Sequence, residues 1–247
     1  TPLQMAGAYA VFANGGYQVP PWFIERIEDD DGEVLWQAPR VQRCDADACE
    51  VAHEALPLDL ETLTETALAE DESVAPEAPP LIAWRPRTVD ARTIWLMDSM
   101  MKDVVQRGTA TRARALNRSD LAGKTGSTNE HLDAWFAGYA PGLAAVAWVG
   151  FDSPATLGRG EYGGRAALPM WIDFMADALV EVPERSLPQP PGIVSARINP
   201  ENGRRARPGA TNAIFEYFRE EDLPDLDDSP AMGSGEEGEQ IAPEELF

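Results

Sequence analysis

Residues 121–128 read Leu-Ala-Gly-Lys-Thr-Gly-Ser-Thr, and they place one lysine and three hydroxyl groups in a segment that is otherwise apolar or small. The pattern favours a strand, and two more strand-like segments occur at 133–140 and 143–151. A buried lysine beside a hydroxyl residue and a glycine is a good receptor for an anion, because the ammonium supplies charge and the hydroxyls supply hydrogen bonds. Gly126 has no side chain, so a ligand can lie against the backbone there.

A Lys-Thr-Gly triplet by itself is common, but its surroundings make it specific. The further landmarks are Thr1-Pro-Leu-Gln-Met-Ala6, Ala13-Asn-Gly-Gly16, Val104-Val-Gln-Arg-Gly-Thr-Ala110, Asp133-Ala-Trp-Phe136 and Ala167-Leu-Pro-Met-Trp-Ile-Asp-Phe174. Together with 123–128 they resemble the C-terminal part of the transpeptidase domain of class A penicillin-binding proteins. The resemblance covers roughly residues 1–40 and 84–220.

The resemblance implies an α/β fold, namely the penicillin-recognising serine transpeptidase/β-lactamase-like fold, with an antiparallel sheet flanked by helices. The chain would be a C-terminal fragment, because it has no initiator methionine, signal peptide or apolar run long enough to cross a bilayer. We expect four segments: residues 1–42 with 84–183 form the C-terminal part of the transpeptidase domain, 43–83 an acidic, largely irregular insertion, 184–219 a Pro-rich linker and small C-terminal extension, and 220–247 an acidic disordered tail.

Hydrophobic periodicity and turn residues predict the elements within these segments. We expect helices at 1–13, 88–107 and 168–180, a short helix near 58–68, and a strand with a turn at 194–203. Residues 23–27 and 34–36 are expected to pair as a hairpin that turns at Asp31-Gly32. The last of the three long helices is expected to bury one stripe of side chains, made by Trp171, Phe174, Met175, Ala178 and Leu179.

The resemblance also assigns roles, position by position, to the Lys-Thr-Gly stretch. In that family a serine of a Ser-x-x-Lys motif attacks a D-Ala-D-Ala peptide, a Ser-x-Asn motif assists proton transfer, and the Lys-Thr-Gly strand forms the opposite wall. Lys124 would act in catalysis by polarising the proton relay and attracting the substrate carboxylate. Ser127 would supply an oxyanion-hole donor through its backbone N–H. Thr125, Gly126, Ser127 and Thr128 would bind the substrate, although the family usually has threonine where this chain has Ser127.

A second motif, Ser99-Met-Met-Lys102, also fits Ser-x-x-Lys and would place serine and lysine one helical turn apart. It lies inside the predicted 88–107 helix, however, and no Ser-x-Asn separates Lys102 from Lys124. We therefore interpret Ser99 and Lys102 as the polar face of that helix, and we expect the nucleophilic serine to lie outside this chain. By itself the chain is expected to be inactive, because such catalytic groups act as a unit.

Other functions remain as alternatives. Hydrolysis at the same site, by a DD-carboxypeptidase or β-lactamase-like enzyme, is one, and a non-catalytic binding module is another. Gly123-Lys-Thr125 also matches the end of a nucleotide-binding P-loop. Arg118 stands where that motif needs its first glycine, however, and the residues after Thr125 have the pattern of a strand instead of a helix.

The charge of the chain is −22, and it is concentrated in two segments. Residues 44–80 and 220–247 each carry 11 Asp or Glu and no Lys or Arg, so the remainder, with 20 acidic and 20 basic residues, is neutral. Without a basic patch a nucleic-acid surface is not expected. The partners that the resemblance implies are peptidoglycan stem peptides and β-lactams. Other cell-wall synthesis proteins are further candidates for partners. The location it implies is the periplasmic face of the bacterial inner membrane, through an anchor upstream of this chain.

No cofactor or metal is expected. Cys44 and Cys49 could form a disulfide, remain free thiols or, with His53, bind zinc; we favour the disulfide first and the metal last. His131 is expected in the turn after the Lys-Thr-Gly strand, where it would be solvated but close enough to leave contact with a substrate open.

Overall fold

The computed structural model describes residues 1–38, 40–44 and 82–227, and it divides into two compact units, Thr1–Pro191 and Gly192–Phe247. Most of the expected insertion, including the helix predicted near 58–68, lies outside the described residues, as does the end of the expected tail. The division falls within the range that the sequence predicts as a linker and extension.

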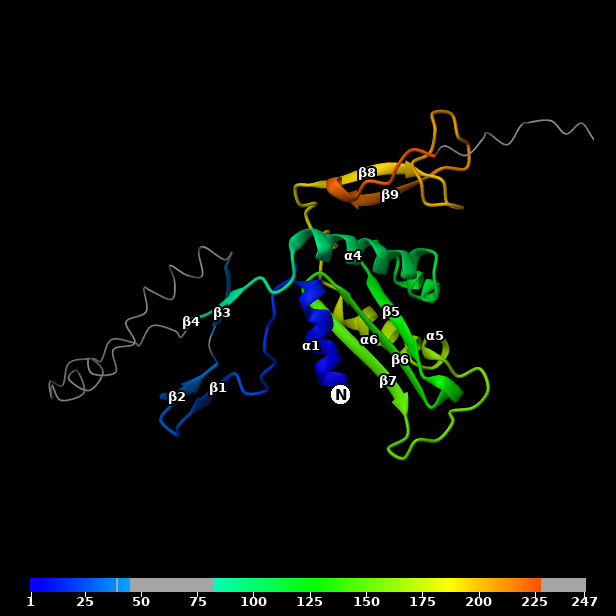
Figure 1. Ribbon diagram of the computed structural model, residues 1–247. Coiled ribbons are helices and arrows are strands. Elements are labelled where there is room, and N and C mark those ends of the chain that lie inside the picture. Colours follow the sequence, from blue (N-terminus) through cyan, green and yellow to red (C-terminus); the bar gives the residue numbers. More distant parts are fainter. Residues whose placement is uncertain (39, 45–81, 228–247) are drawn as a thin grey trace, which may run out of the picture. The chain divides into compact units, whose positions relative to one another are not determined.

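An antiparallel sheet of three strands lies at the centre of the first unit (Figure 1). Its strands are β5 (Ala122–Ser127), β6 (Asp133–Ala140) and β7 (Leu143–Gly150), in the order β5-β6-β7. Lys124 pairs with Ala137, and Gly126 pairs with Trp135. The three strands predicted from residues 121–151 are therefore confirmed, and β5 is an edge strand of this sheet.

Helices cover both faces of the sheet, as expected for this fold. On one face, α1 (Pro2–Ala13) packs against β6 and β7, and α4 (Ala91–Gln106) packs against β5. On the other face lie α6 (Leu168–Ala178), the short α5 (Gly163–Ala166) and a 3-10 helix, η1 (Thr111–Leu116). Both α1 and α4 begin at side-chain caps. Thr1 forms a capping box with Gln4, and Asp90 accepts hydrogen bonds from the first turn of α4.

Alternation along β6 sends successive aromatic side chains into different layers. Phe136 is fully buried and meets the Trp171 ring edge-on, with 4.9 Å between the ring centroids. Tyr139, also fully buried, points to the opposite face and stacks on Phe12 of α1. The Trp135 and Trp148 ring centroids are 5.8 Å apart, and because side chains alternate along a strand, Trp135 and Phe136 face opposite sides of the sheet.

The buried stripe of α6 is narrower than the sequence pattern indicates. Trp171, Met175 and Leu179 are buried at a spacing of four residues, and Ala178 is half-buried. The prediction for Phe174 was wrong, because 53% of its surface is exposed. Its side chain lines an apolar groove of about 680 Å³ between α1, β7 and α6 instead of entering the core.

Two smaller sheets complete the first unit. The predicted hairpin forms from β1 (Arg26–Glu28) and β2 (Val34–Gln37), so its first strand begins three residues later than expected. A parallel pair, β3 (Arg40–Cys44) with β4 (Ile82–Pro86), was not predicted.

The second unit holds the antiparallel pair β8 (Ile193–Ile198) and β9 (Ile214–Arg219), followed by the 3-10 helix η3 (Glu220–Asp222). Of these elements, only the first strand was expected.

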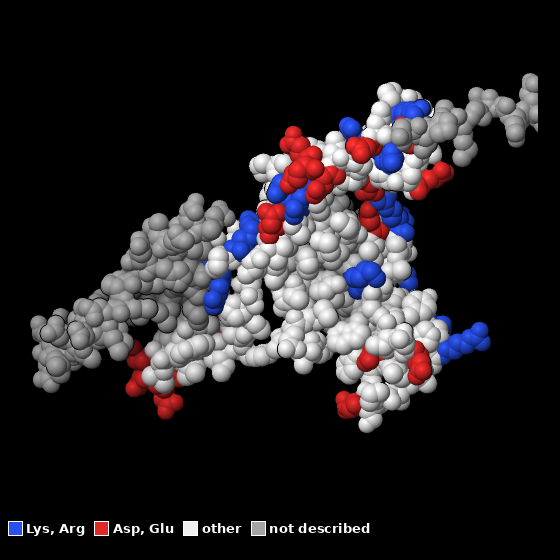
Figure 2. All heavy atoms as spheres, in the orientation of Figure 1, with Lys and Arg blue, Asp and Glu red and all other residues white. Residues whose placement is uncertain are grey.

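The face drawn in Figure 2 shows basic side chains scattered among acidic ones over the described part of the chain. None of the described helices combines the length and the apolar character needed to cross a bilayer.

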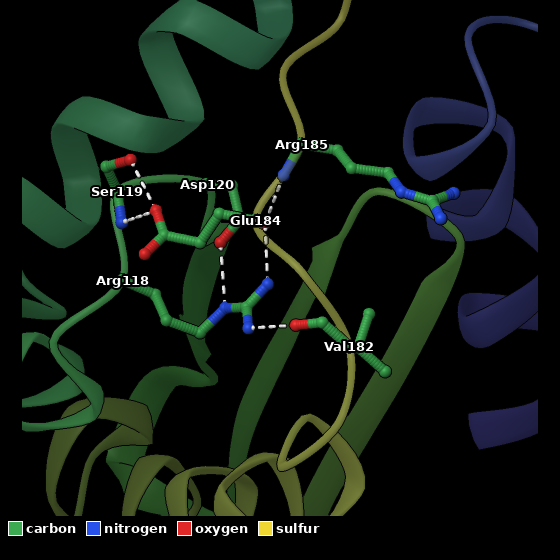
Figure 3. Close-up of polar contacts among 6 residues, drawn as sticks. All are labelled: Arg118, Ser119, Asp120, Val182, Glu184 and Arg185. Carbon is green, nitrogen blue, oxygen red and sulfur yellow. Dashed lines mark hydrogen bonds and ion pairs between the residues drawn. The ribbon is translucent and has the colours of Figure 1, made fainter.

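A polar contact joins the loop before β5 to the segment after α6 (Figure 3). Glu184 accepts hydrogen bonds from the Ser119 hydroxyl at 2.7 Å and from the Ser119 backbone N–H at 3.0 Å. These two bonds favour the ionised carboxylate and lower the pKa of Glu184 from its ordinary value of 4.5. The contact therefore ties the loop before β5 to the chain beyond α6 most strongly while Glu184 is charged.

A pH dependence of stability results from this lowered pKa. The contribution of Glu184 is fully present above its unfolded pKa of about 4.5, and it is lost as the pH falls through the lower, folded pKa. In thermal unfolding we expect the difference in midpoint between the wild type and Glu184→Gln to shrink below about pH 4.5. A difference that stays constant down to about pH 2.5 would contradict this.

Candidate functional site

The candidate site lies along β5, whose side chains alternate between the two faces of the sheet. Ala122 packs with Met101 of α4 and with Tyr139, and Lys124 comes next on the same face. Thr125 and Ser127 point to the other face, toward α5. Lys124 is exposed, so the expectation of a buried lysine was wrong. The reason is that β5 is an edge strand and the buried cluster beside α4 includes Ala122 but does not extend to Lys124.

Two residues outside the sheet, Thr109 and Gly163, hold the hydroxyl groups of Thr125 and Ser127 in place. The Thr125 and Thr109 hydroxyl oxygens lie 2.8 Å apart, and the Ser127 hydroxyl accepts a hydrogen bond from the Gly163 N–H at 2.9 Å. The Lys124 ammonium donates to the carbonyl oxygen of Thr125 at 3.1 Å. The structure therefore places Lys124, Thr125, Gly126 and Ser127 in succession on one edge strand, with the lysine on one face and the two hydroxyls on the other.

Thr109 and Gly163 were missed by the sequence reasoning, although one of them left a signal. Three residues separate the pair Gly163-Gly164 from the predicted last helix, and consecutive glycines often mark a close approach of backbones. A Cβ atom at Gly163 would lie 2.2 Å from the Trp135 carbonyl oxygen and 2.5 Å from the Gly126 carbonyl oxygen. Only glycine therefore allows α5 to start directly against the backbones of β5 and β6.

The turn between β5 and β6 uses its own polar groups. The Thr128 hydroxyl accepts a hydrogen bond from the Asp133 N–H at 2.8 Å, and the Thr128 N–H donates to the Asp133 carbonyl oxygen at 3.2 Å. Between them, Glu130 and His131 both adopt left-handed backbone conformations, with φ of 61° and 54°. The backbone carbonyl of His131 accepts a hydrogen bond from the Leu157 N–H at 2.8 Å. These hydrogen bonds, at both ends of the turn, hold it in a backbone conformation that is costly for non-glycine residues.

The second Ser-x-x-Lys motif lies on α4, but its lysine has a different partner from the one such a motif needs. The Lys102 ammonium is 2.7 Å from Oδ2 of Asp98, and Oδ1 of Asp98 accepts a hydrogen bond from the Tyr139 hydroxyl at 2.9 Å. Asp98 is only 3% exposed, and the Lys102 side chain is 22% exposed. Lys102 therefore belongs to a largely buried ion pair within α4, whose carboxylate also binds Tyr139 of β6, and not to an exposed polar face.

Removing one hydroxyl tests how much this buried pair contributes. Burial, reinforced by the neighbouring Asp98 carboxylate, raises the pKa of Tyr139, so the hydroxyl stays neutral and donates to Asp98. Tyr139→Phe should lower the free energy of unfolding by about 1.5 kcal/mol, the lower end for a bond to a charged group. Denaturant unfolding at neutral pH measures this, and an unchanged midpoint would show that Lys102 alone satisfies Asp98.

Neither a metal site nor a P-loop emerges in the described part of the chain. There, His, Cys, Asp and Glu form no group of three that could hold a metal ion. Cys44 is buried and disulfide-bonded, which agrees with the disulfide interpretation, whereas Cys49 and His53 lie outside the described residues. Residues 123–125 lie within β5 and do not open a helix, which contradicts the P-loop alternative.

Comparison with known proteins gives matches that agree with one another. The family model of the penicillin binding protein transpeptidase domain matches residues 1–175. Penicillin-binding protein 1A of Pseudomonas aeruginosa is 47% identical over 100% of this chain and 31% of its own length. Penicillin-binding protein 1A of Vibrio cholerae is 37% identical over 88% of this chain and 27% of its own length.

A crystal structure of penicillin-binding protein 1A from Haemophilus influenzae has the same fold, with a TM-score of 0.71 and 33% identity over 91% of this chain and 32% of that chain. The chain thus spans about a third of the length of the relatives it matches. Because the family model covers well over half of the 247 residues, the chain belongs to the penicillin-binding protein transpeptidase domain family.

Proposed function

We propose that this chain forms one wall of the active site of a serine DD-transpeptidase that cross-links peptidoglycan stem peptides and is acylated by penicillin. The observation that carries the proposal is the exposed ammonium of Lys124 on an edge strand whose next residues offer two hydroxyls and a glycine. An edge strand can bind an extended peptide by adding it to the sheet, and the glycine leaves room for its backbone.

In the proposed reaction, a serine outside these 247 residues attacks the carbonyl carbon between the two terminal D-Ala residues. The peptide bond breaks, the terminal D-Ala leaves after its nitrogen has gained a proton, and an acyl-enzyme remains. The amine of a neighbouring stem peptide then displaces the serine oxygen, which regains a proton. Lys124 attracts the substrate carboxylate and polarises the proton relay, and the Ser127 N–H stabilises the oxyanion of both tetrahedral intermediates.

The remaining residues of the strand have binding roles in this proposal. Thr125 and Ser127 donate hydroxyl hydrogen bonds to the substrate carboxylate, each held in place by its contact with Thr109 or Gly163. Gly126 permits the close approach. Thr128 ends the series, and because its hydroxyl already binds the Asp133 N–H, it acts by fixing the end of the strand.

The resemblance to the relatives supports further proposals for the whole protein. These are a second activity as a peptidoglycan glycosyltransferase, a membrane anchor, and a location on the periplasmic face of the bacterial inner membrane, all carried by parts outside these 247 residues.

Penicillin labelling of the full-length protein tests the proposal. The labelled protein is digested, and the adduct is located by mass spectrometry. We expect the adduct on the serine of a Ser-x-x-Lys motif outside this chain. An adduct on Ser99 would instead make Ser99-Met-Met-Lys102 the nucleophile motif, and the absence of any adduct would favour a non-catalytic binding module.

A further inference from the structure

An ion pair lies directly before β5, in the same loop as the Ser119 contact (Figure 3). Arg118 and Asp120 form two parallel hydrogen bonds, from Nε to Oδ1 at 2.9 Å and from Nη2 to Oδ2 at 2.8 Å. The Asp120 side chain is 3% exposed and that of Arg118 is 12% exposed. Such a planar, two-bonded pair fixes the relative orientation of both groups, beyond the attraction of their charges.

Both partners also hold the segment after α6. Nη1 of Arg118 donates to the carbonyl oxygen of Val182 at 2.7 Å, and the Arg185 N–H donates to Oδ2 of Asp120 at 3.1 Å. With the bonds of Ser119 to Glu184, three consecutive loop residues are thus attached to residues 182–185. The loop can therefore shift only if the segment after α6 shifts with it.

This attachment lies close to the candidate site along the strand. Asp120 precedes the fully buried Leu121 and Ala122, the first residue of β5. At a rise of about 3.3 Å per residue, Lys124 is about 13 Å further along. Because β5 is an edge strand, the sheet holds it from one side only. Besides its pairing with β6 and its packing against α4, its position therefore depends on contacts toward its two ends, with Thr109 and Gly163 toward the far end and the ion pair at the near end.

A role in stability alone is a weak explanation for this pair. Removing two charges from water costs free energy that their attraction only roughly offsets, and apolar replacements of buried pairs are often neutral or stabilising. What apolar side chains cannot replace is the direction of the hydrogen bonds. The ion pair, unlike an apolar contact, therefore fixes the position at which β5 begins.

We infer that Arg118 and Asp120 are positioning residues for the carboxylate-binding strand: they fix the start of β5 so that Lys124, Thr125 and Ser127 reach a substrate carboxylate together. The inference rests on the proposed function, because it assumes that β5 binds that carboxylate. Neither residue touches the substrate in this arrangement.

The test compares penicillin G with its methyl ester in the full-length protein. Both reagents would acylate the same serine and use the same oxyanion hole, but the ester lacks the charge that β5 is proposed to bind. The ratio of their acylation rates therefore reports recognition of the carboxylate, whereas a loss of folded protein lowers both rates equally. The double variant Arg118→Met/Asp120→Leu removes the directed bonds together with both charges.

We expect the double variant to unfold near the wild-type temperature and its preference for penicillin G over the ester to fall about 10-fold to 100-fold, as for a displacement of about 1 Å. Asp120→Asn, which keeps the size of the side chain and one acceptor, should show a smaller fall and decides the question if the double variant does not fold. Asp103→Asn is the matched control, because Asp103 pairs with Arg107 at 2.5 Å on the exposed side of α4. Its ratio should equal that of the wild type.

A ratio that stays at the wild-type value in both variants would overturn the positioning role, whether or not the rates themselves fall. If the wild type is acylated by neither reagent, the proposed function fails and the inference fails with it. Acylation of the wild type with an unchanged ratio in the variants separates the two cases, because the function then stands and only the positioning role is lost.

Discussion

Lys124→Ala in the full-length protein is expected to lower the rate of acylation by penicillin about 10²-fold to 10⁴-fold, the range for loss of a group that assists proton transfer. The thermal unfolding temperature should hardly change. Lys124 is exposed, and its ammonium donates only to the carbonyl oxygen of the next residue among the described contacts. Exposed side chains of this kind contribute within about 0.5 kcal/mol to stability. Stopped-flow acylation and thermal unfolding measure the two effects separately.

Lys102→Met is the matched control, because it removes the other lysine of the chain. Here the buried carboxylate of Asp98 loses its partner at 2.7 Å, so the unfolding temperature should fall. Acylation of the protein that remains folded should keep the wild-type rate. The opposite pattern, in which Lys102→Met abolishes acylation and Lys124→Ala does not, would transfer the catalytic role to the Ser99-x-x-Lys102 motif.

Gly163→Ala is expected to cost about 3 kcal/mol of unfolding free energy, the upper part of the usual range for overpacking. The added methyl group would meet the carbonyl oxygens of Trp135 and Gly126 at 2.2 and 2.5 Å, and backbone atoms cannot move aside as a flexible side chain can. The start of α5 must therefore move away from β5. The bond from the Gly163 N–H to the Ser127 hydroxyl lengthens or breaks, so the acylation rate should fall as well. Denaturant unfolding and acylation kinetics test both expectations.

Gly164→Ala provides a control on the same short helix. Its Cβ atom would lie 3.0 Å from the Thr109 carbonyl oxygen and 3.6 Å from Cγ2 of Thr125, so small shifts can accommodate it. We expect a clearly smaller loss of stability and of acylation than for Gly163→Ala. Equal losses in the two variants would show that α5 tolerates no change at all, and that the approach at Gly163 has no special role.

The sequence pattern was sufficient to predict a helix or strand where one face of that element is buried over several turns or residues. The strands at 122–127, 133–140 and 143–150 and the helices at 2–13, 91–106 and 168–178 match their predicted ranges within a few residues. The parallel pair of β3 and β4 was not predictable in this way, because its strands are joined across a long segment and local patterns do not show which distant segments pair. The short α5 has too few residues for any periodicity.

Within the candidate site, the residue types were predictable but their environments were not. The Lys-Thr-Gly stretch identified Lys124, whereas its exposure depends on where the buried cluster beside α4 ends. Asp98 and Lys102 are four residues apart on α4, but the Tyr139 hydroxyl that binds Asp98 comes from β6, so the burial of this ion pair leaves no local signal. Phe174 fits a helical stripe in sequence, but the groove it lines is formed by α1, β7 and α6 together.

The different exposure of the two lysines also allows a chemical reagent to distinguish them. Lys102 and Lys124 are the two lysines among the 247 residues, and all other basic side chains are arginine or histidine. An amine-selective acylating reagent needs an accessible nitrogen, and the Lys102 side chain, 22% exposed and held by a largely buried carboxylate at 2.7 Å, is less accessible than the exposed Lys124. Such a reagent should therefore mark β5 in preference to α4. A compound that shields Lys124 from it would reveal its occupancy of the strand even when no acyl group is transferred to a serine.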